Sequence, residues 1–326
     1  MSAEASTGKG YRPGALEALA VGLLILVVAQ RWLVGAFDSP ALQTGATIFV
    51  SIIVQALPFL VMGVVLSGAI AAFVPVSFWR RALPRNPVLA VPVAGAAGVI
   101  LPGCECASVP VANGLMSRGV TPAAALAFLL SSPAINPIVL VSTYVAFPGQ
   151  PMMVVARLLA SLATAIVMGW LWLRFGKPEW LRVGPRDYLT GDNRWHTFRL
   201  TTTHDFLHAG GFLVIGGLTA AILNVVVPQE WLSAVASQPL LAIVGLALLA
   251  VILSICSEAD AFVAASLTEF SLTAKLAFMV VGPMVDIKLV SLQVGTFGRR
   301  FATFFAPTTF VIAVLFSMLV GWWLLT

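Results

Sequence analysis

Charged residues are scarce in this sequence. Of its 326 residues, 10% are charged and 60% are hydrophobic, and the mean hydropathy is +1.00. A soluble domain carries roughly a quarter of its residues as charged side chains, so this composition excludes one. Apolar runs of about 20 residues, each long enough to cross a bilayer as a helix, recur along nearly the whole chain. The sequence therefore predicts an all-α polytopic membrane protein.

Other features that are scarce or missing narrow the function. Three cysteines cannot make a disulfide framework, so they leave the redox compartment open. No G-x-x-x-x-G-K-[ST] motif occurs, so we do not expect the chain itself to use ATP. The net charge of +5 is no sign of nucleic acid, because basic residues in a membrane protein mostly mark its cytoplasmic loops. We expect no enzyme, no cofactor and no nucleic-acid partner.

An internal duplication organises the chain. Two pairs of segments align, 59–75 (FLVMGVVLSGAIAAFVP) with 212–228 (FLVIGGLTAAILNVVVP) and 126–136 (LAFLLSSPAIN) with 276–286 (LAFMVVGPMVD). The offset of 150 in the second pair also places Cys106 on Cys256 without a gap. Landmarks in the same order indicate two repeats of one structural unit.

The predicted organisation is a first helix followed by these repeats. Residues 1–42 form the tail and the first helix, which we read as retained rather than as a secretory signal, because no small-residue cleavage site follows it. The repeats occupy 43–175 and 200–326. The polar stretch 176–199 joins them as a cytoplasmic linker.

The distribution of Lys and Arg predicts how the repeats cross. If all nine apolar segments span the membrane, the basic residues of the loops divide 7 to 9. If 88–118 and 239–269 instead enter and leave on the same side, the division is 14 to 2, as the positive-inside tendency requires. The second repeat is then inverted relative to the first, each has a re-entrant or broken-helix hairpin, and the N-terminus is cytoplasmic. Inverted repeats whose broken helices meet near the midplane are a recurring plan of secondary transporters.

The chemistry is concentrated at the two hairpin tips, PGCECASVP and SICSEADAF. Pro102 and Gly103 suit a sharp turn. All three cysteines of the chain fall on the tips, beside ionisable residues that are costly at membrane depth and therefore indicate function. The candidate substrate ligands at the tips are Cys104, Glu105, Cys106, Cys256, Glu258 and Asp260.

Three converging thiolates suit a soft, thiophilic substrate such as Zn(II), Cu(I) or trivalent arsenic. The carboxylates could supply oxygen ligands or carry protons. Acids at depth outnumber bases by two, which favours a cation or a proton pathway. A plainer interpretation stays open for each group: free cysteine is often a small apolar filler, and the carboxylates could make structural hydrogen bonds across a hairpin.

A second constellation lies in the crossing helix after each hairpin. SSPAINP and VGPMVDIK align Pro133 with Pro283 and Asn136 with Asp286. A proline inside a span frees a backbone carbonyl, and the polar side chain could either satisfy that break or bind the substrate. Lys288 could neutralise Asp286 or Glu258 in the empty site, or it could snorkel to the membrane surface.

Histidine is confined to residues 196–208. His204 and His208 are four residues apart, which places both imidazoles on one helix face with Asp205 beside them. Such a pair could form an accessory zinc site, or it could simply lie at the interface where a helix begins.

The segments CECASVP, RGVTPAAALAFLLSSPAINP, CSEADAFVAASL and GPMVDIK resemble the ArsP-like family of predicted permeases, from about residue 45 to 326. The resemblance implies a duplicated inner-membrane permease. Some members export trivalent organoarsenicals held by tip thiols, which implies that role for Cys104, Cys106 and Cys256. Arsenical exporters tend to have serine where this chain has Glu105, and the C-E-C form resembles a subgroup associated with zinc homeostasis.

We therefore predict a secondary transporter in the cell (inner) membrane for a soft, thiol-binding metal or metalloid. The expected substrate is a zinc-type divalent cation or a trivalent arsenical, exported by rocking of the repeats with proton coupling. Its surroundings are lipid, and an accessory metal-binding or thioredoxin-like protein is an open possibility. A membrane thiol-disulfide oxidoreductase using Cys106 and Cys256 is the alternative, although a C-x-C ring is strained. An ion channel would need a continuous polar lining, which these apolar helices do not provide.

Overall fold

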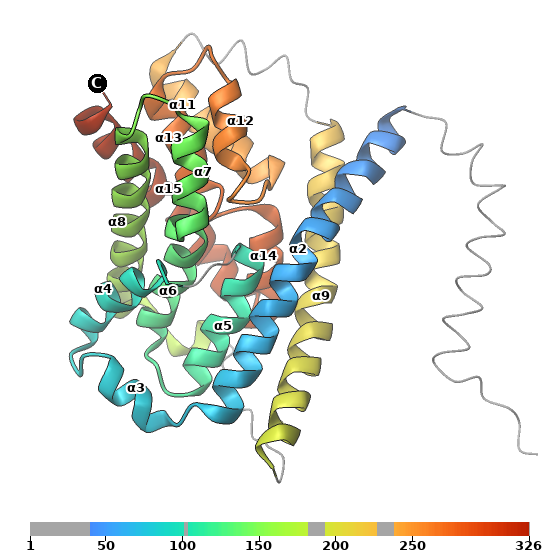
Figure 1. The fold of residues 1–326 in the computed structure, drawn as a ribbon, viewed down its shortest axis with the longest axis vertical. Coiled ribbons are helices and arrows are strands. Elements are labelled where there is room, and N and C mark those ends of the chain that lie inside the picture. Colours follow the sequence, from blue (N-terminus) through green and yellow to red (C-terminus); the bar gives the residue numbers. More distant parts are fainter. Residues whose placement is uncertain (1–39, 101–103, 182–192, 227–237, 326) are drawn as a thin grey trace, which may run out of the picture. The chain divides into compact units, whose positions relative to one another are not determined.

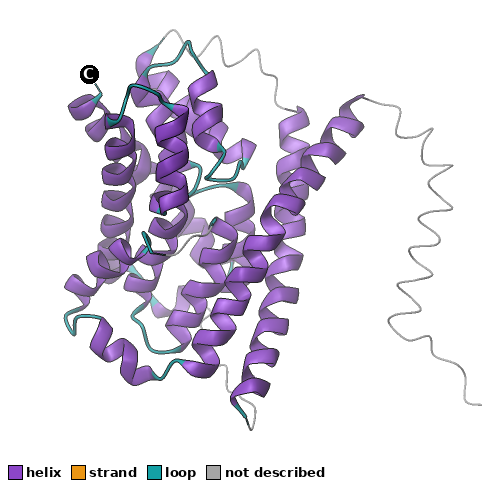
Figure 2. Cartoon of the chain, viewed as in Figure 1, coloured by secondary structure: helices purple, strands orange, loops and turns teal. Residues whose placement is uncertain are grey.

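The computed structural model describes residues 40–100, 104–181, 193–226 and 238–325. These ranges contain helices and no strand (Figures 1 and 2). Within them, five stretches are long and apolar enough to cross a membrane, namely Pro40–Phe73, Pro122–Ala146, Met152–Phe175, Arg194–Val226 and Arg299–Leu324. The prediction of an all-α polytopic membrane protein is confirmed. The predicted first helix within 1–42 lies almost wholly outside the described residues.

The contacts divide the chain into two units, residues 1–47 and 48–326. The described part of the first unit is the beginning of a long helix, where the Thr44 and Thr47 hydroxyls donate to carbonyl oxygens four residues earlier, at 2.8 Å each. The residues of both predicted tips belong to the second unit.

The helices form two series. The first comprises α2 (Pro40–Phe73), α3 (Val76–Ala82), α4 (Pro87–Ala97), α5 (Glu105–Ser117), α6 (Pro122–Ile135), α7 (Pro137–Ala146), α8 (Met152–Phe175) and the 3-10 turn η1 (Pro178–Trp180). The second comprises α9 (Arg194–Val226), α11 (Pro239–Leu253), α12 (Asp260–Ser266), α13 (Leu272–Val281), α14 (Ile287–Phe297) and α15 (Arg299–Leu324).

The order of α2 and α4–α8 recurs in α9 and α11–α15. Helices α6 and α13 begin 150 residues apart, as do α7 and α14. The two series also meet reciprocally, since α5 of the first packs against α14 of the second, and α12 of the second packs against α7 of the first. On this basis we propose that the chain is divided as the sequence predicts, into repeats 43–175 and 200–326 separated by 176–199.

Each series contains an interrupted pair of short helices. Helices α4 and α11 have 11 and 15 residues, fewer than the roughly 20 that a span needs. In Figure 1, α4 and α5 lie in the lower half of the view, whereas α11 and α12 lie in the upper half. The re-entrant hairpins that enter the membrane from opposite sides stay a prediction. Pro102 and Gly103, the predicted turn residues of the first hairpin, lie outside the described residues.

A second interruption follows in each series, between α6 and α7 and between α13 and α14. The Asn136 side chain closes the first one, because its Oδ1 accepts from the Val139 N–H at 3.0 Å and its Nδ2 donates to the Ser132 carbonyl at 3.3 Å. Asp286 closes the second by accepting from the Leu289 N–H at 2.6 Å. Both residues are N-caps of the helix that follows. These side chains therefore bond to backbone groups at the helix breaks. This is one of the two roles that the sequence left open, the other being substrate binding.

Small residues let the helices around the first tip approach closely. A Cβ at Gly63 of α2 would lie 2.5 Å from the Ala107 Cα of α5, and a Cβ at Gly114 would lie 2.9 Å from the Ser67 hydroxyl. Apolar helices in lipid gain little from hydrophobic exclusion, so close contact between backbones contributes much of their association. The α2–α5 contact therefore seats the helix that carries the first tip.

We expect Gly63→Ala to destabilise the protein by about 1–3 kcal/mol, because the added methyl group would meet the backbone and Cβ of Ala107, which cannot move aside as a flexible side chain can. The measurement is the thermal unfolding midpoint of the purified chain in detergent. Gly211→Ala is the matched control: this helical glycine has no atom within 4 Å of an added Cβ, and the change should be neutral or slightly stabilising. Equal midpoints for Gly63→Ala and the wild type would contradict the close packing of α2 on α5.

Candidate functional site

The first tip places three potential ligands on one turn. Cys104 is the N-cap of α5, and Glu105 and Cys106 are its first two residues. Their ligand atoms, two thiols and a carboxylate oxygen, all lie within 4.8 Å of one another. All three side chains are buried, and no disulfide joins them. The C-E-C spacing thus forms a compact set of one oxygen and two sulfur donors.

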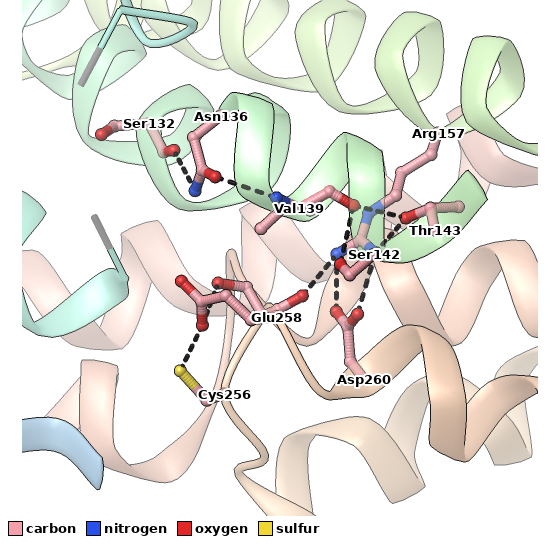
Figure 3. Close-up of polar contacts among 10 residues, drawn as sticks. Ser132, Asn136, Val139, Ser142, Thr143, Arg157, Cys256, Glu258 and Asp260 are labelled. Carbon is pink, nitrogen blue, oxygen red and sulfur yellow. Dashed lines mark hydrogen bonds and ion pairs between the residues drawn. The ribbon is translucent and has the colours of Figure 1, made fainter. Parts of the chain in front are cut away.

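The second tip adds a third thiol to this set. The Cys256 and Cys104 thiols are within hydrogen-bonding contact of each other. The Cys256 thiol also donates to Glu258 Oε2 at 2.6 Å (Figure 3). We call Cys104, Glu105, Cys106, Cys256 and Glu258 the thiol cluster. Its members come from both series of helices.

The backbone of the second tip turns without the Pro-Gly pair of the first. Ser254 ends α11 in the left-handed region, at φ 49°, which is uncommon for a residue with a side chain. Its hydroxyl accepts from the Ile287 N–H at 3.2 Å, which ties the turn to the beginning of α14. The Cys256 carbonyl then accepts from the Ala259 and Asp260 N–H groups. Sequence reasoning missed Ser254, because serine carries no specific signal for this conformation.

Lys288 of α14 reaches the first tip. Its ammonium group donates to Glu105 Oε1 at 2.8 Å and lies 3.6 Å from Asp286 Oδ2. The side chain is 3% exposed, so it does not snorkel to the surface. The sequence predicts that Lys288 neutralises Asp286 or Glu258. In the structure the Lys288 ammonium group lies beside Asp286, but the other acid beside it is Glu105 and not Glu258. Lys288 pairs with Glu105 because α14, which carries Lys288, packs on α5, which begins with Glu105.

Asp260, at the start of α12, is held by Arg157 of α8. The guanidinium group donates to both carboxylate oxygens, at 2.8 and 2.6 Å (Figure 3). Because Arg157 takes both oxygens of Asp260, this carboxylate supports the tip in this structure, while its role as a substrate ligand stays a prediction. Sequence reasoning counts Arg157 only as one of the two bases at membrane depth and assigns it no role, although an arginine inside an apolar span is itself a signal of function.

The acids around the thiol cluster outnumber the bases, and some of their buried oxygens accept no hydrogen bond from the described residues. Four acids (Glu105, Glu258, Asp260, Asp286) stand against two bases (Arg157, Lys288), all in the described part of the second unit. Glu105 Oε2 and Glu258 Oε1 are buried oxygens with no hydrogen-bond partner among the described residues, and Asp286 Oδ2 has no hydrogen bond there but lies 3.6 Å from the Lys288 ammonium group. Buried acceptors without a partner are costly. They favour a cation at this place.

The histidines lie elsewhere on α9. The rings of His204 and His208 stack nearly parallel, at 5.8 Å and 11°. His204 Nδ1 is 3.5 Å from Asp205 Oδ1, while the Ser67 hydroxyl donates to Asp205 Oδ2 at 2.9 Å. Among the described residues these groups do not form a set of three close ligand atoms. An accessory metal site at His204 and His208 stays a prediction.

Comparison with known proteins shows which family the chain belongs to. A protein of Bacillus subtilis (strain 168), UPF0718 protein YcgR, is 36% identical over 281 residues, which cover 84% of this chain and 96% of that protein. A protein of Streptococcus mutans serotype c, whose name describes a subunit of a two-component membrane permease complex, is 34% identical over 84% of this chain and 94% of its own length. No solved structure matches the chain. The model of the ArsP family, described as predicted permeases, matches residues 41–322. The chain therefore belongs to this family of predicted membrane permeases.

Proposed function

We propose that this permease is a secondary transporter for a thiophilic divalent cation of the zinc type, and that the thiol cluster is its substrate site. The observation that carries the proposal is the set of two thiols and a carboxylate within 4.8 Å, buried on one helical turn, with the Cys256 thiol in contact with it. Cysteine thiolates with a carboxylate oxygen are a ligand set that Zn(II) accepts.

Charge favours a divalent cation over a neutral arsenical. Trivalent arsenic species need thiols but gain nothing from a hard anionic oxygen. Glu105 lies between the two thiols in the sequence, and its second oxygen has no partner among the described residues. A cation of charge +2 would satisfy that oxygen and offset the excess of acids.

We further propose that the protein lies in the inner membrane with its N-terminus in the cytoplasm. It exports the cation from the cytoplasm, and the entry of protons drives this export. Moving one positive charge out against an interior-negative potential costs about 2.3 kcal/mol per 100 mV, so export of a divalent cation needs a driving ion. The chain has no nucleotide-binding motif. Rocking of two repeats about a central site is a common way to alternate access, and the thiol cluster takes residues from both.

A thiol-disulfide oxidoreductase is the second candidate. The observation that favours it is the contact between the Cys104 and Cys256 thiols, a different pair from the Cys106–Cys256 pair that the sequence suggested. Burial argues against it, because none of the three cysteines is more than 3% exposed. A redox partner protein could not reach them in this conformation.

A second membrane component is part of the proposal. The name of the Streptococcus mutans relative describes a subunit of a two-component complex, and we propose the same kind of assembly for this chain. Co-purification with the full-length chain would identify the second component.

The transport test uses the chain reconstituted in vesicles that contain a zinc-sensitive dye, with an imposed pH gradient. We expect Zn(II) to move, and we expect Cys106→Ser and Glu105→Gln each to lower the rate at least about tenfold, because each removes a ligand. Glu269→Gln is the control, since Glu269 is an exposed acid in the loop between α12 and α13, and it should leave the rate unchanged.

Methylarsenite is tested in parallel. Movement of methylarsenite that needs Cys106 but survives Glu105→Gln would place the chain with arsenical exporters instead. If neither solute moves while thiol alkylation detects a reversible Cys104–Cys256 bridge, the oxidoreductase becomes the better reading.

Lys288 gives an independent prediction. Its ammonium group acts as a resident cation between Glu105 and Asp286, so Lys288→Met leaves buried negative charge unpaired. We expect the ion-free variant to lose about 3–5 kcal/mol of stability and to be stabilised by Cd(II) more than the wild type is. The measurement is the thermal unfolding midpoint with and without Cd(II).

Lys275→Met is the matched control for Lys288→Met. Lys275 lies in α13 and is largely buried, but it forms no ion pair with an acid in the described part of the chain. Its Cd(II)-dependent shift should equal that of the wild type. Equal shifts for Lys288→Met and the wild type would show that Lys288 does not stand in for the substrate.

A further inference from the structure

Arg157 is the largest fully buried side chain of the described residues, with 0% exposure. Four hydrogen bonds hold its guanidinium group. Nη1 donates to Asp260 Oδ1 and to the Thr143 hydroxyl, both at 2.8 Å. Nη2 donates to Asp260 Oδ2 at 2.6 Å and to the Ser257 carbonyl at 3.3 Å. Thr143 belongs to α7, so one arginine connects two helices of the first series with the tip of the second.

The contact with the Ser257 carbonyl is the informative one. Ser257 lies directly between Cys256 and Glu258, the two members of the thiol cluster that the second tip supplies. Asp260 lies two residues further on and begins α12. Arg157 thus binds the tip at two points, one in the turn at the Ser257 carbonyl and one at Asp260, which begins the helix that follows (Figure 3).

We propose that Arg157 is a positioning residue of the substrate site: it holds Cys256 and Glu258 of the second tip against Cys104, Glu105 and Cys106 of the first. This inference rests on the proposed function of the thiol cluster. It adds that the third thiol becomes a ligand only because a base from the other series fixes its backbone.

The chemistry of the side chain explains why arginine occupies this position. A guanidinium group is planar and presents five donors in a rigid fork, so it can bind both carboxylate oxygens and still reach a carbonyl and a hydroxyl. An ammonium group is a compact point charge and cannot hold that geometry. A turn that is free to shift by about 1 Å would weaken a ligand set that depends on distance.

The first tip has an equivalent anchor, although of a different kind. Lys288 binds the Glu105 side chain, which is itself a member of the thiol cluster. The hydrogen bonds of Arg157 to described residues go to none of the member side chains, but one goes to the backbone beside two of them. A cation that enters can therefore displace Lys288 from Glu105, whereas Arg157 keeps its partners throughout.

The test counts thiolate ligands by the ultraviolet charge-transfer absorbance of Cd(II) bound to the full-length chain in detergent. The wild type should show three thiolates per ion, and Cys256→Ser should show two. Arg157→Met paired with Asp260→Leu removes both buried charges together, so the variant avoids an unpaired charge and is expected to fold. It should show two thiolates, and adding Cys256→Ser should lower the absorbance no further.

Two variants separate positioning from general stability. Thr143→Val removes one bond of Arg157 but leaves those to Asp260 and Ser257, so it should keep three thiolates. Arg157→Lys keeps the charge without the fork and should lose the Cys256 thiolate, although it folds better than Arg157→Met alone.

The outcomes test the proposed function and the positioning role of Arg157 separately. A wild type that binds no Cd(II) through thiolates overturns the proposed function itself. Three thiolates in the Arg157→Met/Asp260→Leu variant overturn the positioning role and leave the proposed function standing. A wild type with only two thiolates, unchanged by Cys256→Ser, also overturns the positioning role, because Cys256 would then be no ligand to position.

Discussion

A charge buried in an apolar bundle must find an opposite charge, and in this permease each tip finds it on the other half of the chain. Glu105 at the start of α5 pairs with Lys288 of α14, and Asp260 at the start of α12 pairs with Arg157 of α8. Removing one partner of such a pair costs about 3–5 kcal/mol, because the other charge stays buried. Neither tip can therefore separate from the opposite helices without a substantial penalty. The pairs bring the tips together, and the thiol cluster is formed as a consequence.

The two pairs differ in what they leave for a substrate. Arg157 uses both oxygens of Asp260, so this pair is closed. Lys288 uses one oxygen of Glu105, and the other has no partner among the described residues. One tip is thus anchored firmly, while the other offers an acceptor next to two thiols. This asymmetry suits a site in which one half holds its shape and the other exchanges its resident ammonium group for a cation.

Much of this could be predicted because the informative residues are few. An apolar chain with three cysteines, all on two broken helices at related positions, indicates where those helices meet. The breaks at Asn136 and Asp286 are likewise visible in the sequence, since a proline lies three residues before each and a polar group is needed to cap the next helix. The partners of the charges could not be predicted. Helix α6 is buried on all sides, and helices that are apolar all round carry no stripe that shows which face meets which neighbour.

The sequence by itself determined that this is a helical membrane protein and that its thiols and acids lie on paired tips, since these follow from composition, repeats and spacing. Only the tertiary structure decided that Lys288 binds Glu105 rather than Glu258, that Arg157 anchors the second tip, and that Ser254 turns it with φ 49°. These contacts join residues between 33 and 183 positions apart. They depend on the rotation and register of packed helices, which close side-chain fit decides and local sequence patterns do not encode.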